Sequence, residues 1–144
     1  MRDSQQARVR RWEEGWIDWN RNTITLQECR ELVKWACRLF RLKVSPRVKQ
    51  HMNRAMSYSI SEHCLISLRA DQHKNRAVVL HESAHFISDE IFGSKVQWHG
   101  EEFFGVYLRL LIKARVAPAV ALIASAKAAK LKWKEIHPSK VRED

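Results

Sequence analysis

Ten consecutive residues, VVLHESAHFI at 78–87, constrain the fold of this chain most strongly. They place His81 and His85 four residues apart, a spacing that puts two side chains on one face of an α-helix. The apolar residues around the pair predict a buried helix, in which two histidines without a partner would cost free energy. A shared metal ion would supply that partner. The alternative is a chance spacing, with the histidines at the surface or bonded to the backbone.

A catalytic zinc ion usually takes three protein ligands and leaves a fourth position for water, so a further ligand is expected downstream. His99 is the predicted third ligand, and thirteen residues separate it from His85. Gly93 lets the chain turn, so that the next helix can return antiparallel and present His99 near its beginning. Glu101 and Glu102, just downstream, are the alternatives.

Glu82 directly follows the first histidine and projects about 100° around the helix, toward a water bound to the metal rather than the metal itself. It is the predicted general base, which takes a proton from that water and passes it to the leaving amine. Asp89 lies four residues beyond His85. We expect Asp89 to accept the free N–H of a ligand histidine or to face solvent.

Residues 25–42 carry apolar side chains at three- and four-residue spacing, which predicts an amphipathic helix. Thr23 or Thr25 is suited to cap it. Cys29 and Cys37 fall on its apolar face and are expected to be buried thiols rather than redox groups. The sequence has three cysteines and no C-x-x-C pair, which argues against both a disulfide framework and a zinc ribbon.

Short strands are predicted after Pro46, which ends the helical pattern. Three segments there show partial alternation and residues that favour strands. The last two are expected to form a hairpin around Ser61 and Glu62. In chain order the three segments are RVKQHM, AMSYSI and HCLISLRA.

Three helices are predicted in the second half of the chain. The first begins near Asp71, carries the two histidines and ends near Gly93. The second runs from about Gly100, and the third has Pro118 in its first turn. The order of helix, three strands and three helices predicts an α+β fold in a single domain that spans 1–144.

The segment VVLHESAHFISDEIFGSKVQWHGEEF resembles the active-site core of compact zincin metallopeptidases, the SprT-like group in particular. The resemblance is specific over about residues 65–112, and Phe103 matches a phenylalanine after the group's histidine-glycine pair, where we expect a packing role. Four further residues match that group's motif position by position: His81, Glu82, His85 and His99.

The resemblance implies a zincin-like fold and a peptidase that holds one Zn²⁺ ion. It also implies a protein or peptide substrate that pairs with an edge strand, for which HCLISLRA is the candidate. SprT-like proteins often carry a four-cysteine zinc ribbon after this core, and this sequence has none. Larger members act on proteins attached to DNA, a specificity that the motif alone does not carry. No oxyanion stabiliser is identified, because Tyr107 is expected to be a core residue rather than part of the site.

The two ends of the chain have distinct compositions. Residues 1–24 form an extension rich in Trp and Arg, in which Trp12, Trp16 and Trp19 follow helical spacing and are expected to pack against the domain. Residues 116–144 are predicted to be a basic helix and tail. Four lysines are expected along that helix: Lys127, Lys130, Lys132 and Lys134.

The chain has 26 Lys and Arg against 16 Asp and Glu, a net charge of +10 that favours polyanionic partners. Nonspecific nucleic-acid binding through this surface is one expectation, and a merely solvated basic face is the other. A signal peptide and a membrane span are not evident, which predicts an intracellular, cytoplasmic protein without membrane contact. The alternative to a peptidase is a basic binding or structural protein on a zincin scaffold, without catalysis.

Overall fold

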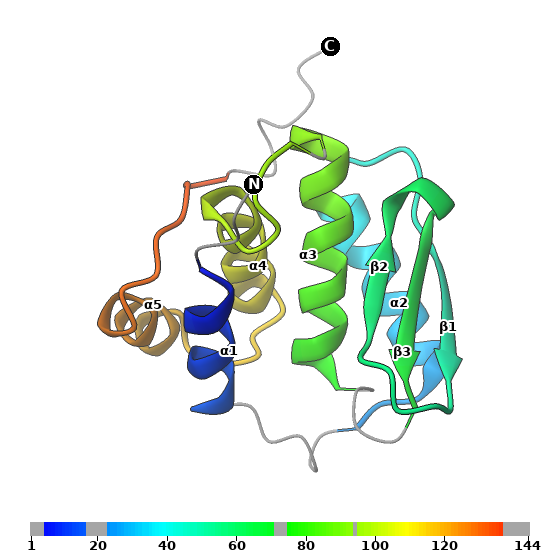
Figure 1. The fold of residues 1–144 in the computed structure, drawn as a ribbon, viewed down its shortest axis with the longest axis horizontal. Coiled ribbons are helices and arrows are strands. Elements are labelled where there is room, and N and C mark those ends of the chain that lie inside the picture. Colours follow the sequence, from blue (N-terminus) through cyan, green and yellow to red (C-terminus); the bar gives the residue numbers. More distant parts are fainter. Residues whose placement is uncertain (1–4, 17–22, 71–74, 94, 137–144) are drawn as a thin grey trace.

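The computed structural model describes residues 5–16, 23–70, 75–93 and 95–136 (Figure 1). In this part of the chain, helices and a small sheet combine in an α+β fold, which confirms the predicted fold class. The elements are α1 (Gln6–Glu14), α2 (Leu26–Leu39), β1 (Arg47–His51), β2 (Tyr58–Ile60), the 3₁₀ helix η1 (Ser61–His63), β3 (Leu65–Arg69), α3 (Arg76–Phe92), α4 (Glu101–Lys113) and α5 (Ala119–Ala128).

The sheet has the strand order β1-β3-β2, with β1 parallel and β2 antiparallel to β3. The predicted hairpin between the second and third strands is therefore confirmed, and η1 forms its turn. The prediction that HCLISLRA is the edge strand is wrong, because β3 lies at the centre of the sheet. Residues 65–68 are all buried, as expected of a strand with a neighbour on each side. The strand at the edge nearest α3 is β2.

Helix α3 occupies the middle of the fold, with the sheet and α2 on one side and α1 and α4 on the other (Figure 1). Its burial on several sides explains why apolar residues surround the histidines. Asn75 caps the helix, because its side chain accepts a hydrogen bond from the Val78 amide at 2.9 Å. The predicted signal Asp71 lies outside the described residues. The helix ends at Phe92, and Gly93 follows with a φ of 80°, as the sequence predicts.

Helix α2 begins as predicted, with Thr25 as its N-cap. The Thr25 hydroxyl accepts from the Glu28 amide at 3.0 Å, and the Glu28 carboxylate accepts from the Thr25 amide at 3.0 Å. Cys29 and Cys37 are buried in the core, which confirms their packing role. Burial raises the pKa of the Cys37 thiol to about 12, with smaller contributions from neighbouring acidic groups, so this thiol stays protonated.

Part of the N-terminal extension belongs to the folded core. Trp12 lies on α1 and packs edge-on against Phe104 of α4, with ring centroids 5.1 Å apart. Its indole nitrogen donates to the Ser125 hydroxyl at 2.9 Å. Trp16 packs against Trp12, whereas Trp19 lies outside the described residues. The helix ends at Glu14, so Trp12 belongs to it and Trp16 lies just beyond its end.

The C-terminal segment departs from the predicted basic helix. Helix α5 ends at Ala128, and Pro118 is its N-cap rather than a first-turn residue. Of the four lysines expected along this helix, only Lys127 belongs to it. Lys130 has a φ of 59°, which turns the chain back over α4, where the Lys134 amide donates to the Glu101 carbonyl at 3.1 Å. Packing of this extended segment replaces further helical turns. Among the described residues, no helix combines the length and apolar character that a bilayer crossing requires.

Gly105 of α4 lets the C-terminal segment lie directly on the helix. A Cβ atom at this position would stand 2.1 Å from the Lys134 carbonyl oxygen. Gly105→Ala is therefore expected to lower the free energy of unfolding by about 1–3 kcal/mol, although alanine is intrinsically the better helix former by about 1 kcal/mol. Urea unfolding measures the change. The control is Gly15→Ala, whose Cβ would meet nothing closer than 3.4 Å, and equal stability of the two variants would contradict the expected clash.

Candidate metal centre

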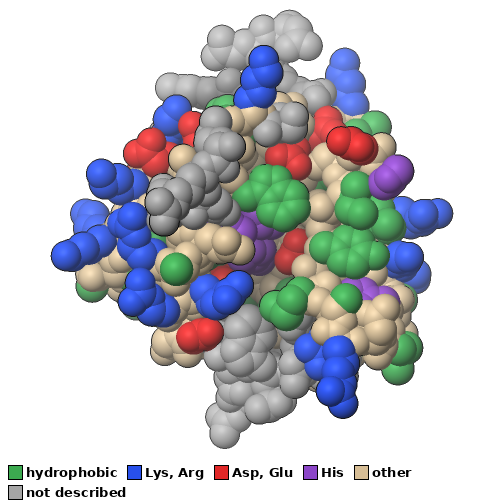
Figure 2. Space-filling model, in the orientation of Figure 1, with side chains coloured by type: hydrophobic (Ala, Val, Ile, Leu, Met, Phe, Trp, Pro, Cys, Tyr) green, Lys and Arg blue, Asp and Glu red, His purple; other side chains and the backbone are tan. Residues whose placement is uncertain are grey.

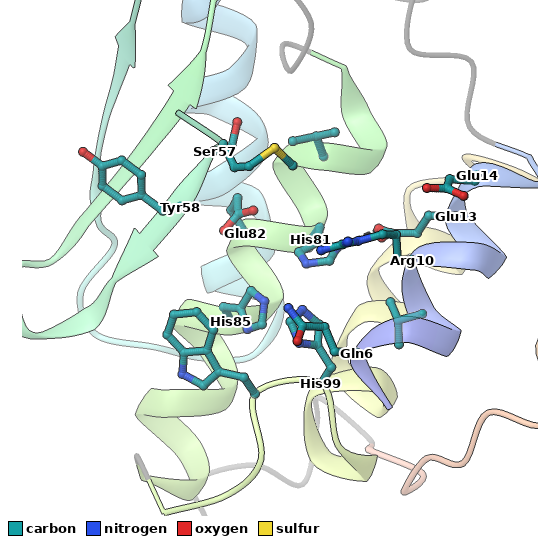
Figure 3. A pocket seen from close by; sticks show the side chains of 14 residues that line it. Gln6, Arg10, Glu13, Glu14, Ser57, Tyr58, His81, Glu82, His85 and His99 are labelled. Carbon is teal, nitrogen blue, oxygen red and sulfur yellow. Dashed lines mark hydrogen bonds and ion pairs between the residues drawn. The ribbon is translucent and has the colours of Figure 1, made fainter. Parts of the chain in front are cut away.

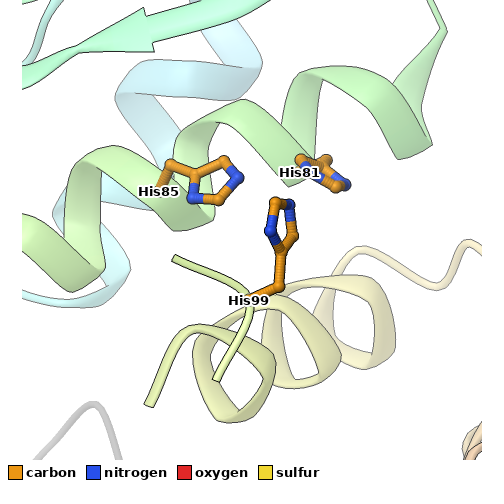
Figure 4. Close-up of side chains that lie close together, drawn as sticks. All are labelled: His81, His85 and His99. Carbon is orange, nitrogen blue, oxygen red and sulfur yellow. The ribbon is translucent and has the colours of Figure 1, made fainter. Parts of the chain in front are cut away.

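The three predicted histidine ligands come together in the structure. His81 and His85 lie one turn apart on α3, and His99 directly precedes Gly100, the N-cap of α4 (Figure 4). One ring nitrogen from each histidine lies within 4.8 Å of the other two. The antiparallel return after Gly93 brings His99 to α3, as the sequence predicts.

The donor set fits a small divalent cation such as zinc. Tetrahedral zinc with Zn–N bonds of about 2.0–2.1 Å needs nitrogens about 3.3 Å apart. The nitrogens stand within 4.8 Å of one another, so the imidazole rings would have to move closer together to hold the ion. Three imidazoles beside a cavity match the ligand number of catalytic zinc sites, which leave one position open.

The alternative ligands, Glu101 and Glu102, do not join the cluster. Glu101 is exposed, and Glu102 forms an ion pair with Lys134 at 3.1 Å. Neither belongs to the described residues that line the cavity beside the histidines. Asp89 accepts a hydrogen bond from the Ser61 hydroxyl at 2.7 Å. Of the two roles expected of Asp89, support of a ligand histidine is not seen among the described residues, because the hairpin turn at η1 supplies the partner of this half-buried side chain.

Glu13 of α1 supports the cluster and was missed by the sequence reasoning. Its Oε2 atom accepts hydrogen bonds from His81 Nδ1 and from the Tyr107 hydroxyl, each at 2.6 Å. A signal was present, because Glu13 shares one helical face with Val9, Trp12 and Trp16. A carboxylate on an apolar face needs a buried partner.

Glu13 and His81 stabilise each other's charged forms in a buried environment. Burial alone would lower the pKa of His81, but the charge and hydrogen bond of Glu13, together with Glu82, raise it to about 9. Burial alone would raise the pKa of Glu13, and the interactions with His81 and Tyr107 bring it below its usual range. Glu13 is therefore a carboxylate that faces an imidazole N–H.

Phe103 packs beside all three imidazoles, in agreement with its predicted packing role. Its ring is stacked on His85 with centroids 4.2 Å apart and lies 5.1 Å from the rings of both His81 and His99. Burial, followed by the charges of the other two histidines, lowers the pKa of His85 well below its usual value. His85 is therefore neutral, which is the form of imidazole that binds a metal ion.

Glu82 lies on the same helix and lines the cavity beside the histidines (Figure 3). The side chain is buried, and burial is the main reason why its pKa is raised to about 7. His81 opposes this shift and Glu13 adds to it. A carboxylate with a pKa near neutrality is suited to both accepting and releasing a proton.

The cavity in front of the histidines has a volume of about 350 Å³. Helix α1 and the chain around β2 form opposite walls, and α3 carries His81, Glu82 and His85 between them (Figure 3). Hydrophobic side chains gather around the opening, where histidine is visible (Figure 2). Two of the lining residues are large apolar side chains with high exposure, Met56 at 64% and Trp98 at 52%.

The remaining site predictions separate into packing and surface roles. Tyr107 is fully buried and is not among the described residues that line the cavity, so its packing role is confirmed. Among the histidines outside the cluster, which are expected to be ordinary surface residues, His63 is exposed. His51 is half-buried, and its two ring nitrogens lie 2.7 Å from the Ser67 hydroxyl and the Ala55 carbonyl. His73 and His137 lie outside the described residues.

Comparison of the chain with protein-family models, with curated proteins and with solved structures gave no match. The function must therefore be inferred from the geometry of the three histidines, Glu13 and Glu82.

Proposed function

We propose that the protein is a zinc-dependent peptidase of the zincin type, with a motif that resembles that of SprT-like enzymes. The observation that carries this proposal is the convergence of His81, His85 and His99 beside a cavity that Glu82 also lines. Zinc held by these imidazoles would polarise a carbonyl group and lower the pKa of a coordinated water toward about 7. The residues of the chain would supply orientation and proton transfer.

Glu82 is the proposed general base. Its buried carboxyl group, with a pKa of about 7, can accept the proton of the attacking water. The same proton then passes to the amine that leaves when the peptide bond breaks. Because Glu82 follows His81 on α3, its carboxylate lies beside the imidazole cluster without being one of the three ligands.

A peptide substrate would lie in the cavity along β2. This strand pairs with β3 on one side, so its other edge offers backbone groups to an extended peptide. Trp98 and Met56 expose apolar surface at the cavity and suit apolar substrate side chains. Pairing with the substrate, which was expected of HCLISLRA, is therefore proposed for β2, the other strand of the same hairpin.

A second candidate function is that of a basic binding protein in which the metal ion serves stability. The observation in its favour is the net charge of +10, which suits nonspecific contact with nucleic acid in an intracellular setting. The buried Glu82 favours the peptidase, because a purely structural site has no need of a carboxyl group that titrates near neutrality.

Metal content of the purified, untagged protein tests the proposed centre. Elemental analysis is expected to find about one zinc per wild-type chain and much less in His99→Ala, which removes one of the three ligands. His63→Ala is the matched control, because this exposed histidine lies on η1 and is expected to leave the zinc content unchanged. Wild-type protein that holds no zinc even after reconstitution would refute the metal centre and the peptidase function.

A further inference from the structure

We propose that α1 is a positioning element of the metal centre, in which Glu13 orients His81 and Gln5 fixes the backbone at His99. This inference rests on the proposed metal centre and goes beyond its ligands. It assigns a function to the N-terminal segment, and it predicts that metal binding and the docking of α1 stabilise each other.

The first contact determines which nitrogen of His81 is available to a metal ion. Because Glu13 accepts a hydrogen bond from His81 Nδ1 at 2.6 Å, the proton on Nδ1 is held by the carboxylate. Nε2 is then the nitrogen that would lose its proton and coordinate a metal ion. A carboxylate behind a ligand histidine also makes the imidazole a stronger donor and restricts its rotation.

The position of Glu13 is itself fixed by α4. The Tyr107 hydroxyl donates to the same carboxylate oxygen at 2.6 Å, and the Tyr107 ring is fully buried. The Tyr107 and His81 rings also pack edge-on, with centroids 5.0 Å apart. The carboxylate therefore receives donors from α3 and α4 and joins α1 to both helices.

The second contact holds the chain at His99. Gln5, the N-cap of α1, is buried, and its Nε2 donates to the backbone carbonyl of His99 at 3.0 Å. The same nitrogen donates to the Lys132 carbonyl at 3.1 Å, and Gln5 Oε1 accepts from the Lys132 amide at 2.7 Å. Gln5 thereby ties the segment that carries the third ligand to α1 and to the C-terminal segment.

These contacts place one end of α1 against His99 and the other against His81. A displaced helix would release the backbone at one ligand and the imidazole at another, so the folded but undocked protein should bind zinc less tightly. By reciprocity, zinc should favour the docked helix by the same factor. If α1 only anchored the fold, losing its contacts would lower the free energy of unfolding and leave the zinc affinity of the folded protein unchanged. A positioning role predicts that the zinc affinity of the folded protein falls as well.

The test is the zinc dissociation constant of the full chain, measured by competition with a chromophoric chelator. Glu13→Ala is expected to weaken zinc binding by about 10- to 100-fold, the usual effect of losing a partner of a ligand histidine. Glu13→Gln keeps an acceptor oxygen without the charge and should lose less. Glu14→Gln is the matched control, since it removes the same charge from the next, exposed residue of α1.

Hydrogen exchange of the α1 amides supplies an independent readout, and zinc is expected to slow it in the wild type more than in Glu13→Gln. The inference is overturned if folded Glu13→Ala or Glu13→Gln binds zinc within threefold of the wild type, or if Glu14→Gln weakens binding as much as Glu13→Gln does. If Glu13→Ala does not fold, the zinc dissociation constant of Glu13→Gln is the deciding measurement. Wild-type protein that binds no zinc would instead refute the metal centre itself.

Discussion

Glu82→Gln is expected to lower kcat for peptide hydrolysis by at least about 100-fold while the protein keeps about one zinc per chain. Glutamine has nearly the same shape as glutamate, so the walls of the cavity should persist. The substitution removes the group that accepts the proton of the attacking water. Fluorogenic peptides that vary in sequence, assayed with zinc-loaded protein, measure kcat, and elemental analysis measures the metal.

A matched control for this experiment is available on the same helix. Glu90 is an exposed residue of α3, and Glu90→Gln should leave both zinc content and kcat unchanged. Equal hydrolysis by the wild type and Glu82→Gln would exclude Glu82 as the base. Zinc loss in Glu82→Gln would instead indicate that this carboxylate is a ligand.

Phe103→Ala is expected to destabilise the metal-free protein by about 3–5 kcal/mol, the usual cost of removing a buried aromatic ring. The ring is fully buried and contacts all three imidazoles, so the cavity left behind would lie next to the metal centre. Urea unfolding in the presence of a chelator measures the change without any contribution from bound metal.

The conservative variant Phe103→Leu separates the loss of packing from the loss of the aromatic ring. Leucine keeps much of the apolar volume, so a cost of only about 1.5 kcal/mol or less is expected. Both variants should also bind zinc more weakly than the wild type, because the imidazoles lose a rigid neighbour. An unfolding free energy for Phe103→Ala within about 1 kcal/mol of the wild type would contradict a supporting role for the ring.

The features predicted from the sequence are those that depend on local spacing. The spacing of His81 and His85 determines that both lie on one face of α3, and Gly93 marks where that helix ends. A short connection then requires the chain to return along α3, which is why His99 could be chosen ahead of the nearby glutamates. The Thr25 cap and the hairpin follow from equally local patterns.

The features that could not be predicted depend on contacts between distant segments. Glu13 and His81 are 68 residues apart, and no helical period or turn signal relates them. The central place of β3 follows from its parallel pairing with β1, which the hairpin alone does not indicate. The end of α5 was misplaced for a similar reason, since tertiary packing over α4 outweighs the helix propensity of the lysines and alanines.

The contact between Gln5 and Lys132 has a consequence for the order of folding. It joins residues separated by 127 positions and therefore closes a very long loop. This contact cannot stabilise the protein until most of the chain has folded. During synthesis, α2, the sheet and α3 can assemble while residue 132 is still untranslated. The proposed ligand His99 acquires its full support only when Gln5 and Lys132 have met, so the native metal centre should mature after the core has formed.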